Sequence, residues 1–202
     1  MAETNRVTPL GEIVAIDQRG LFMGNRGNLH RGRTIVRPWQ VRRWITCALQ
    51  FRGRVAPKWE PGRWTPLFFW DEAVALAAGH RPCASCRRDD YDAWLGAWEA
   101  AFGDRPNADA MDRRLHAERV DGKRQRRHAV AWADVPQGAF VVGEETPLLV
   151  LSDRLIPWSP AGYGKPIDRP GTGDTLALTP PSAIAVIRDG YRPVIHPRAG
   201  SS

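Results

Sequence analysis

The feature that most constrains this chain is a pair of cysteines, Cys83 and Cys86, separated by two residues. This spacing allows both sulfurs to bind one tetrahedral metal ion. Arg81, Arg87 and Arg88 flank the pair, and nearby positive charge lowers the pKa of a thiol and favours the thiolate that binds metal. The motif therefore predicts a zinc site within a basic surface, as found in many nucleic-acid-binding modules.

Cys47 is the one further cysteine among the 202 residues, and an odd number of cysteines argues against a framework of disulfides. If all three cysteines bind one zinc ion, a fourth ligand is needed, and histidine is the usual complement. Cys47 lies on a predicted strand that could pair beside the loop of His30, whereas His80 is so near the cysteine pair that its ligation would be crowded. The residues alone leave the ligand open among His30, His80, His116, His128 and His196.

The positive charge of the chain, +7 in total, is concentrated in two blocks. Residues 19–63 hold eleven Lys or Arg and a single acidic residue, and residues 113–128 hold seven basic and two acidic residues. Between them, residues 64–112 hold four basic and nine acidic residues. Such clustering indicates a polyanionic partner, DNA or RNA, with an acidic protein as the alternative. We expect phosphate contacts from Arg26, Arg31, Arg33, Arg37, Arg42, Arg43, Arg113, Arg114, Lys123, Arg124, Arg126 and Arg127.

The hydrophobic pattern predicts an α+β fold. Alternating residues over 41–54 give the clearest strand, and helices are expected over 72–78, 87–102 and 108–120. The remainder is β-rich, with a short helix over 181–188 and a final strand over 192–196. We expect a small zinc-binding module, a twisted antiparallel sheet with two helices, packed on a β-rich C-terminal lobe. The division falls at residues 1–120 and 121–202, unless the chain forms a single domain.

The first twelve residues lack the basic and apolar regions of a signal peptide. The apolar run over residues 73–78 is far too short to cross a bilayer. We therefore expect a soluble, cytoplasmic protein without a membrane partner.

Residues 67–87, LFFWDEAVALAAGHRPCASCR, combine an aromatic strand, a short helix rich in Ala and Glu, and a Cys-x-x-Cys run. This segment resembles the zinc-binding domain of bacterial Ada-type methylphosphotriester-DNA methyltransferases, and the resemblance extends over about residues 19–90. The residues that carry it best are Gly79, Arg81, Pro82, Cys83, Cys86 and Arg87.

The resemblance places His30 where that family has its methyl-accepting cysteine, and Thr34 where it has the next cysteine. It therefore implies a zinc ion held by His30, Cys47, Cys83 and Cys86 on a small α/β module that binds DNA. The alternates for the histidine are His80 and His116. Because histidine cannot accept a methyl group as a thioether, we expect a structural zinc ion rather than methyl transfer.

A second pattern is His116-Ala117-Glu118 on the third predicted helix. Zinc deaminases have His-x-Glu followed by Pro-Cys-x-x-Cys. Here the order of the two motifs is reversed, because Pro-Cys-x-x-Cys lies at residues 82–86, before His116. His116 and Glu118 could instead act as an acid/base pair on nucleic acid or a nucleotide, in a hydrolase- or deaminase-type reaction. The structural alternative is that His116 faces the core and Glu118 pairs with Arg114. The leading interpretation is a non-enzymatic, zinc-stabilised nucleic-acid-binding protein that prefers DNA to RNA.

Overall fold

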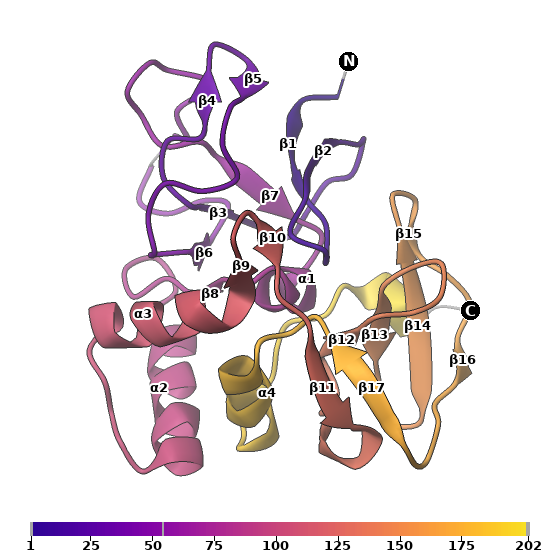
Figure 1. Cartoon of the computed structure of the whole chain (residues 1–202). Coiled ribbons are helices and arrows are strands. Elements are labelled where there is room, and N and C mark those ends of the chain that lie inside the picture. Colours follow the sequence, from indigo (N-terminus) through magenta and orange to yellow (C-terminus); the bar gives the residue numbers. More distant parts are fainter. Residues whose placement is uncertain (1, 54, 201–202) are drawn as a thin grey trace.

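The computed structural model describes residues 2–53 and 55–200, a part of the chain that folds into four α-helices and several sheets (Figure 1). The mixed α/β class is therefore confirmed. Arg54, at the end of the predicted strand over 41–54, and residues 1, 201 and 202 of the predicted domains lie outside the described residues. Within the described ranges, no helix combines the length and apolar character that a membrane crossing requires.

The N-terminal sheet has six strands in the order β2–β1–β7–β3–β6–β8. A separate hairpin stands beside it at the top of Figure 1 and pairs β4 (His30–Arg31) with β5 (Thr34–Ile35). The strands of the sheet are β1 (Thr4–Val7), β2 (Ile13–Ala15), β3 (Phe22–Asn25), β6 (Ile45–Cys47), β7 (Leu67–Phe69) and β8 (Arg81–Pro82).

The prediction of an antiparallel sheet is wrong for two of its pairs, because β1 pairs with β7 and β6 with β8 in parallel. The helix α1 (Glu72–Ala77) explains the second pair. It connects β7 to β8, and two strands that run in the same direction need such a crossover. The crossover places β8 directly beside β6.

The strand predicted over residues 41–54 is also shorter than expected, since only Ile45–Cys47 pairs in the sheet. Beyond Cys47 the chain turns, and Arg52 has a φ of 48°, a left-handed conformation that interrupts a strand. The strand therefore ends at Cys47.

The remaining helices are α2 (Arg88–Phe102), α3 (Ala108–Arg119) and α4 (Pro181–Arg188), close to their predicted ranges. A hairpin of β9 (Val120–Asp121) and β10 (Arg124–Gln125) follows α3 directly. The C-terminal sheet comprises β11 (His128–Ala131), β12 (Phe140–Val141), β13 (Leu148–Val150), β14 (Arg154–Ser159), β15 (Gly162–Tyr163), β16 (Ile167–Asp168) and β17 (Asp174–Ala177), and two short 3-10 turns cover Trp132–Asp134 and Pro197–Gly200.

Helix α1 lies between the N-terminal and C-terminal sheets, where it contacts β7 and β12, and all six of its residues are buried (Figure 1). Its apolar side chains join core clusters that contain residues of both predicted domains. At its N-terminus, the Asp71 carboxylate accepts hydrogen bonds from the Val74 amide at 2.9 Å and the Tyr163 hydroxyl at 2.7 Å. The two halves therefore share their core around α1, and their description as separate domains stays a prediction.

The strand predicted over residues 192–196 is wrong, because this segment pairs with α1 instead of with a sheet. The Val194 amide donates to the Glu72 carboxylate, and the His196 amide donates to Asp71, both at 3.0 Å. Two buried carboxylates therefore take the place of a strand partner for this backbone.

An ion pair buried on both sides links β8 to α3. The Arg81 guanidinium donates two parallel hydrogen bonds to the Asp112 carboxylate, at 2.9 and 2.8 Å, and the two side chains are 2% and 3% exposed. Such a bidentate pair fixes orientation as well as distance. It positions α3, and with α3 the β9–β10 hairpin, relative to the N-terminal sheet.

We expect Asp112→Asn to lower the free energy of unfolding by about 3–5 kcal/mol, because it leaves the Arg81 charge buried without a partner. The matched control is Asp109→Asn on the same helix, whose carboxylate is exposed and lies 3.7 Å from Arg43, and which should change stability by less than about 1 kcal/mol. Chemical denaturation followed by circular dichroism measures both. Equal, small losses in the two variants would contradict the structural role given to the pair.

Candidate metal centre and cationic cavity

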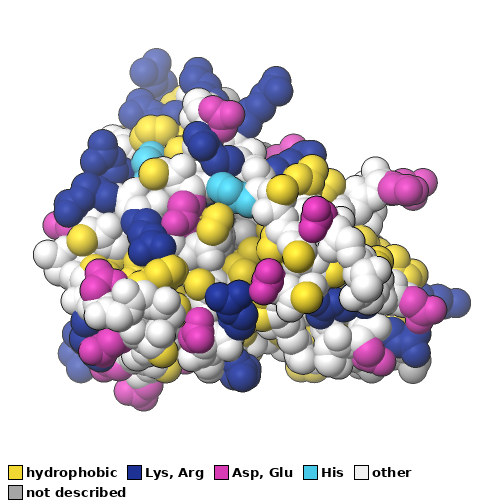
Figure 2. Space-filling view, turned by 60° about the horizontal axis from the view of Figure 1, so that its bottom comes forward, with side chains coloured by type: hydrophobic (Ala, Val, Ile, Leu, Met, Phe, Trp, Pro, Cys, Tyr) yellow, Lys and Arg dark blue, Asp and Glu magenta, His cyan; other side chains and the backbone are white. Residues whose placement is uncertain are grey.

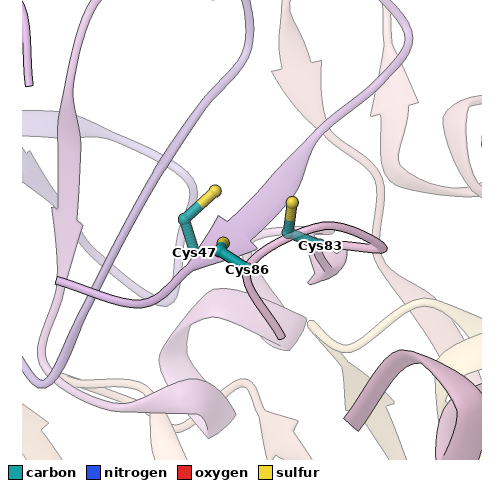
Figure 3. Close-up of side chains that lie close together, drawn as sticks. All are labelled: Cys47, Cys83 and Cys86. Atoms are coloured by element: carbon teal, nitrogen blue, oxygen red, sulfur yellow. The ribbon is translucent and has the colours of Figure 1, made fainter. Parts of the chain in front are cut away.

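Three cysteines meet at the end of β6 (Figure 3). The sulfur atoms of Cys47, Cys83 and Cys86 all lie within 4.8 Å of one another, and they form the one such group of His, Cys, Asp or Glu side chains in the described part of the chain. The Cys83 amide donates to the Thr46 carbonyl at 2.9 Å, which holds the turn over residues 83–86 against the end of the strand. In a tetrahedral zinc–thiolate site the sulfurs lie about 3.8 Å apart, so this triad has the donors and the spacing to hold a single metal ion.

Cys83 is the thiol that loses its proton most readily. Its pKa is lowered far below the usual range because the Cys47 and Cys86 thiols donate hydrogen bonds to its sulfur, assisted by the backbone amides of Cys86 and Ser85. The pKa of Cys47 is raised, because its thiol donates hydrogen bonds to both neighbouring sulfurs and is partly buried. For Cys86, the hydrogen bond from Cys47 lowers the pKa, but donation to Cys83 and partial burial raise it, and the net shift is upward. A metal ion would displace these two protons and gather three thiolates around itself.

The arginines that flank the Cys-x-x-Cys motif do not lie free beside the sulfurs. The Arg87 guanidinium is buried and lies 2.9 Å from the Glu72 carboxylate and 2.8 Å from that of Asp90. Arg81 is taken up by the pair with Asp112. Arg81 and Arg87 therefore stabilise the turn and its surroundings. The pKa of Cys83 is lowered by neighbouring thiols and backbone amides, and not by the flanking arginines as the sequence had predicted.

The structure does not bring His30 to the three cysteines. Its Nδ1 lies 2.6 Å from the Thr65 hydroxyl and its Nε2 3.1 Å from the Glu60 carbonyl, so both ring nitrogens already have partners. The ring packs edge-on against Trp59. His30 thus fastens the β4–β5 hairpin to the loop before β7, and the fourth ligand that the resemblance implies is not supplied from this position.

The alternates His80 and His116 also lie elsewhere. The His80 ring is buried between Trp44 and Phe69, and its Nε2 accepts a hydrogen bond of 3.3 Å from the Arg26 guanidinium. Burial, reinforced by neighbouring arginines, lowers its pKa well below the usual value. His116 packs edge-on against Trp39, and burial lowers its pKa to about 4. Both rings are therefore neutral near pH 7 and belong to a second site, next to a cavity.

This cavity, of about 840 Å³, is where the two basic blocks of the sequence meet. Its wall combines the turn between β1 and β2, residues 35–39 from the end of β5 onward, and the β9–β10 hairpin with the end of α3. Six Lys or Arg line the cavity, whereas Glu12 is the single acidic residue in its wall. The basic residues are Arg26, Arg37, Arg119, Lys123, Arg124 and Arg127.

Two of these arginines, Arg26 and Arg119, are each 2% exposed. Both guanidiniums lie against the ring of Trp44, with Cζ at 4.3 and 4.0 Å from its centroid. Their hydrogen bonds go to neutral acceptors, namely backbone carbonyls and one histidine ring each. Desolvation lowers the pKa of Arg26 to about 9 and that of Arg119 well below its usual value. Their positive charges are thus only weakly compensated by the protein.

Arg26, one of the predicted phosphate contacts, is buried at the cavity and does not lie on the open surface. Arg37, Lys123, Arg124 and Arg127 are exposed and line the same cavity. Gln125 also lies in this wall. The sequence did not predict it, because a single Gln within a basic run matches no motif.

The other predicted phosphate contacts spread around this region. A neighbouring hollow of about 680 Å³ is lined by Arg42, Arg43 and Arg113, together with Asp109 and Asp112. Figure 2 shows Lys and Arg gathered along the upper and upper-left edge of one face of the molecule. The remaining members are exposed: Arg31, Arg33 at 3.7 Å from Glu3, Arg114 at 3.3 Å from Glu118 and Arg126 at 4.0 Å from Asp121.

His116 and Glu118 are not brought together as an acid/base pair. Glu118 accepts hydrogen bonds from the amide and the hydroxyl of Ser182, at 2.9 and 2.6 Å, and also pairs with Arg114. His116 lies on Trp39 and shares a hydrogen bond of 3.2 Å with Arg119. Glu118 thus fastens α3 to the first turn of α4, which is a structural role.

Comparison of the chain with protein-family models, with curated proteins and with solved structures found no match. The resemblance to Ada-type zinc domains therefore rests on the quoted residues alone and stays a prediction.

We expect the purified protein to carry one metal ion per chain, and Cys47→Ser to lose it, because the triad then supplies two sulfurs. The matched control is His30→Gln, which removes a candidate ligand but leaves the triad intact, and which should retain the ion. Elemental analysis of the folded variants gives the metal content. Loss of metal in His30→Gln, or full metal content in Cys47→Ser, would contradict the assignment.

Proposed function

We propose that this protein binds nucleic acid, DNA in preference to RNA, through the cationic cavity and the arginines around it. The observation that carries the proposal is the meeting of the two basic blocks, far apart in sequence, on the wall of one cavity. Arg37 comes from the first block, and Lys123 and Arg124 come from the second. Clustered positive charge of this kind attracts the phosphate backbone and releases its condensed counterions. The preference for DNA rests on the resemblance to Ada-type domains.

The acidic segment between the two blocks does not cancel this charge. Several of its carboxylates are used inside the protein, as Asp71, Glu72 and Asp112 are all buried and paired. Others, such as Asp89 and Asp92, lie exposed on α2, which does not contribute to the cavity wall. The positive field of the cavity is therefore left to act on a ligand.

The metal in this proposal is zinc, held by the thiolates of Cys47, Cys83 and Cys86. Thiolates are soft ligands that suit zinc, and three protein ligands leave the fourth position to water or another small ligand. A bound zinc ion supplies a rigid tetrahedral centre that fixes neighbouring ligands. The chain's own part is to tie the end of β6 to the turn after β8, and β6 begins two residues after Arg43. Tying these two elements together is a structural role for the ion, and the open fourth position is a feature it would share with catalytic zinc sites.

A salt titration tests the proposal. Affinity for a short DNA oligonucleotide should fall steeply as salt rises, and each lost phosphate contact should reduce the slope of log affinity against log salt by about 0.7–0.9. We expect this reduction for Lys123→Ala and Arg124→Ala.

The control is Arg154→Ala, which removes the same charge from an exposed site on β14, where Arg154 is paired with Asp153 and Asp168. This variant should bind like the wild type. Fluorescence anisotropy measures all affinities. A salt-independent affinity, or no binding at low salt, would overturn the proposal, and so would equal losses in all three variants.

A further inference from the structure

The inner wall of the cavity contains buried polar atoms that the protein does not satisfy. In the described part of the chain, ten buried side-chain nitrogen or oxygen atoms have no hydrogen-bond partner, and four of them belong to residues that line this cavity. Three are donors, Arg26 Nη2, Arg119 Nε and Trp39 Nε1, and the fourth is the acceptor Gln125 Oε1. Buried polar groups are normally paired, so this concentration of unpaired donors needs an explanation.

The charges of Arg26 and Arg119 also indicate a missing anionic partner. Among residues 2–53 and 55–200, no salt bridge joins Arg26 or Arg119 to a carboxylate, and Asp112 and Glu118 act on Arg119 only from beyond that distance. By contrast, Arg81 is paired with Asp112 and the buried Arg87 with Glu72. Burying a guanidinium without an anion is unfavourable, and two such charges also repel each other. The Trp44 ring and backbone carbonyls reduce this penalty, but they leave both positive charges in place.

We propose that this inner wall binds a phosphate monoester, the terminal phosphate of a nucleic-acid strand, on Arg26 and Arg119. The inference rests on the proposed function for the identity of the strand, but not for the phosphate. A phosphate dianion supplies the two negative charges and the several acceptor oxygens that the wall lacks, and arginine is the side chain best suited to bind it.

The size and rim of the cavity fit such a ligand. A volume of about 840 Å³ lies within the range of small-molecule sites and leaves room for a nucleotide beyond its phosphate. Trp39, half-buried in the wall, offers an aromatic face and an N–H donor to the sugar or base. Lys123 and Arg124 at the rim can then contact the next phosphates of the strand. Glu12, the single acidic side chain of the wall, is exposed.

The test compares one single-stranded DNA oligonucleotide in three forms: with a 5′-phosphate, with a 3′-phosphate, and with hydroxyl groups at both ends. We expect one of the phosphorylated forms to bind about tenfold more tightly than the hydroxyl form, from charge-assisted hydrogen bonds formed only with the terminal phosphate. Arg26→Gln and Arg119→Gln should each abolish this difference. The control Lys123→Ala should weaken all three forms by the same factor and keep the difference.

A competition on the wild-type protein keeps the test valid if either buried variant fails to fold. Inorganic phosphate should reduce the affinity for the preferred phosphorylated form to that of the hydroxyl form. Equal binding of all three forms would overturn the inference while leaving nucleic-acid binding intact.

The same experiments distinguish the terminal phosphate of a nucleic-acid strand from a free phosphate or mononucleotide. If no oligonucleotide binds but a mononucleotide or inorganic phosphate raises the melting temperature of the wild type and not of Arg26→Gln, the proposed function fails and the phosphate site stands with a free ligand. If neither class of ligand binds, both proposals fail.

Discussion

The buried pair of Arg81 and Asp112 connects the cysteine triad to the cationic cavity. Arg81 lies on β8, which pairs with β6 and precedes the Cys-x-x-Cys turn, whereas Asp112 lies on α3, which leads into the β9–β10 hairpin of the cavity. The candidate metal centre and the cationic cavity thus share one rigid connection. Replacing either Arg81 or Asp112 alone leaves the other charge buried without its partner, which is strongly destabilising.

The buried arginines of this protein fall into two groups with different consequences. Arg81 and Arg87 have carboxylate partners and hold secondary-structure elements together. Arg26 and Arg119 have neutral partners and line a cavity. The first group stabilises the fold, and the second keeps positive charge out of water at a place where a ligand can compensate it. Proteins tolerate such unfavourable burial mainly where it serves binding.

Much of the local structure could be predicted from the sequence. Helices with clear caps, such as α1 after Asp71 and α3 after Asn107, begin where their capping residues stand. The meeting of the three cysteines could be predicted, because an odd number of cysteines argues against disulfides and favours a shared metal ion. Long-range pairings were harder, because the parallel pair of β6 and β8 depends on the crossover through α1, and a β-like pattern over residues 192–196 does not reveal that buried carboxylates bind its backbone.

Sequence also could not distinguish a surface arginine from a buried one. Arg26 and Arg37 have the same chemistry and lie in the same basic block, yet Arg26 is enclosed against Trp44 and Arg37 is exposed.

Hydrogen–deuterium exchange on the protein with and without a DNA oligonucleotide tests the central claim, that the two basic blocks bind one strand together, most directly. The account predicts joint protection of residues 35–39 and 119–127, from the two basic blocks, when the strand binds. Binding that protects only one of these segments, or neither, would contradict it.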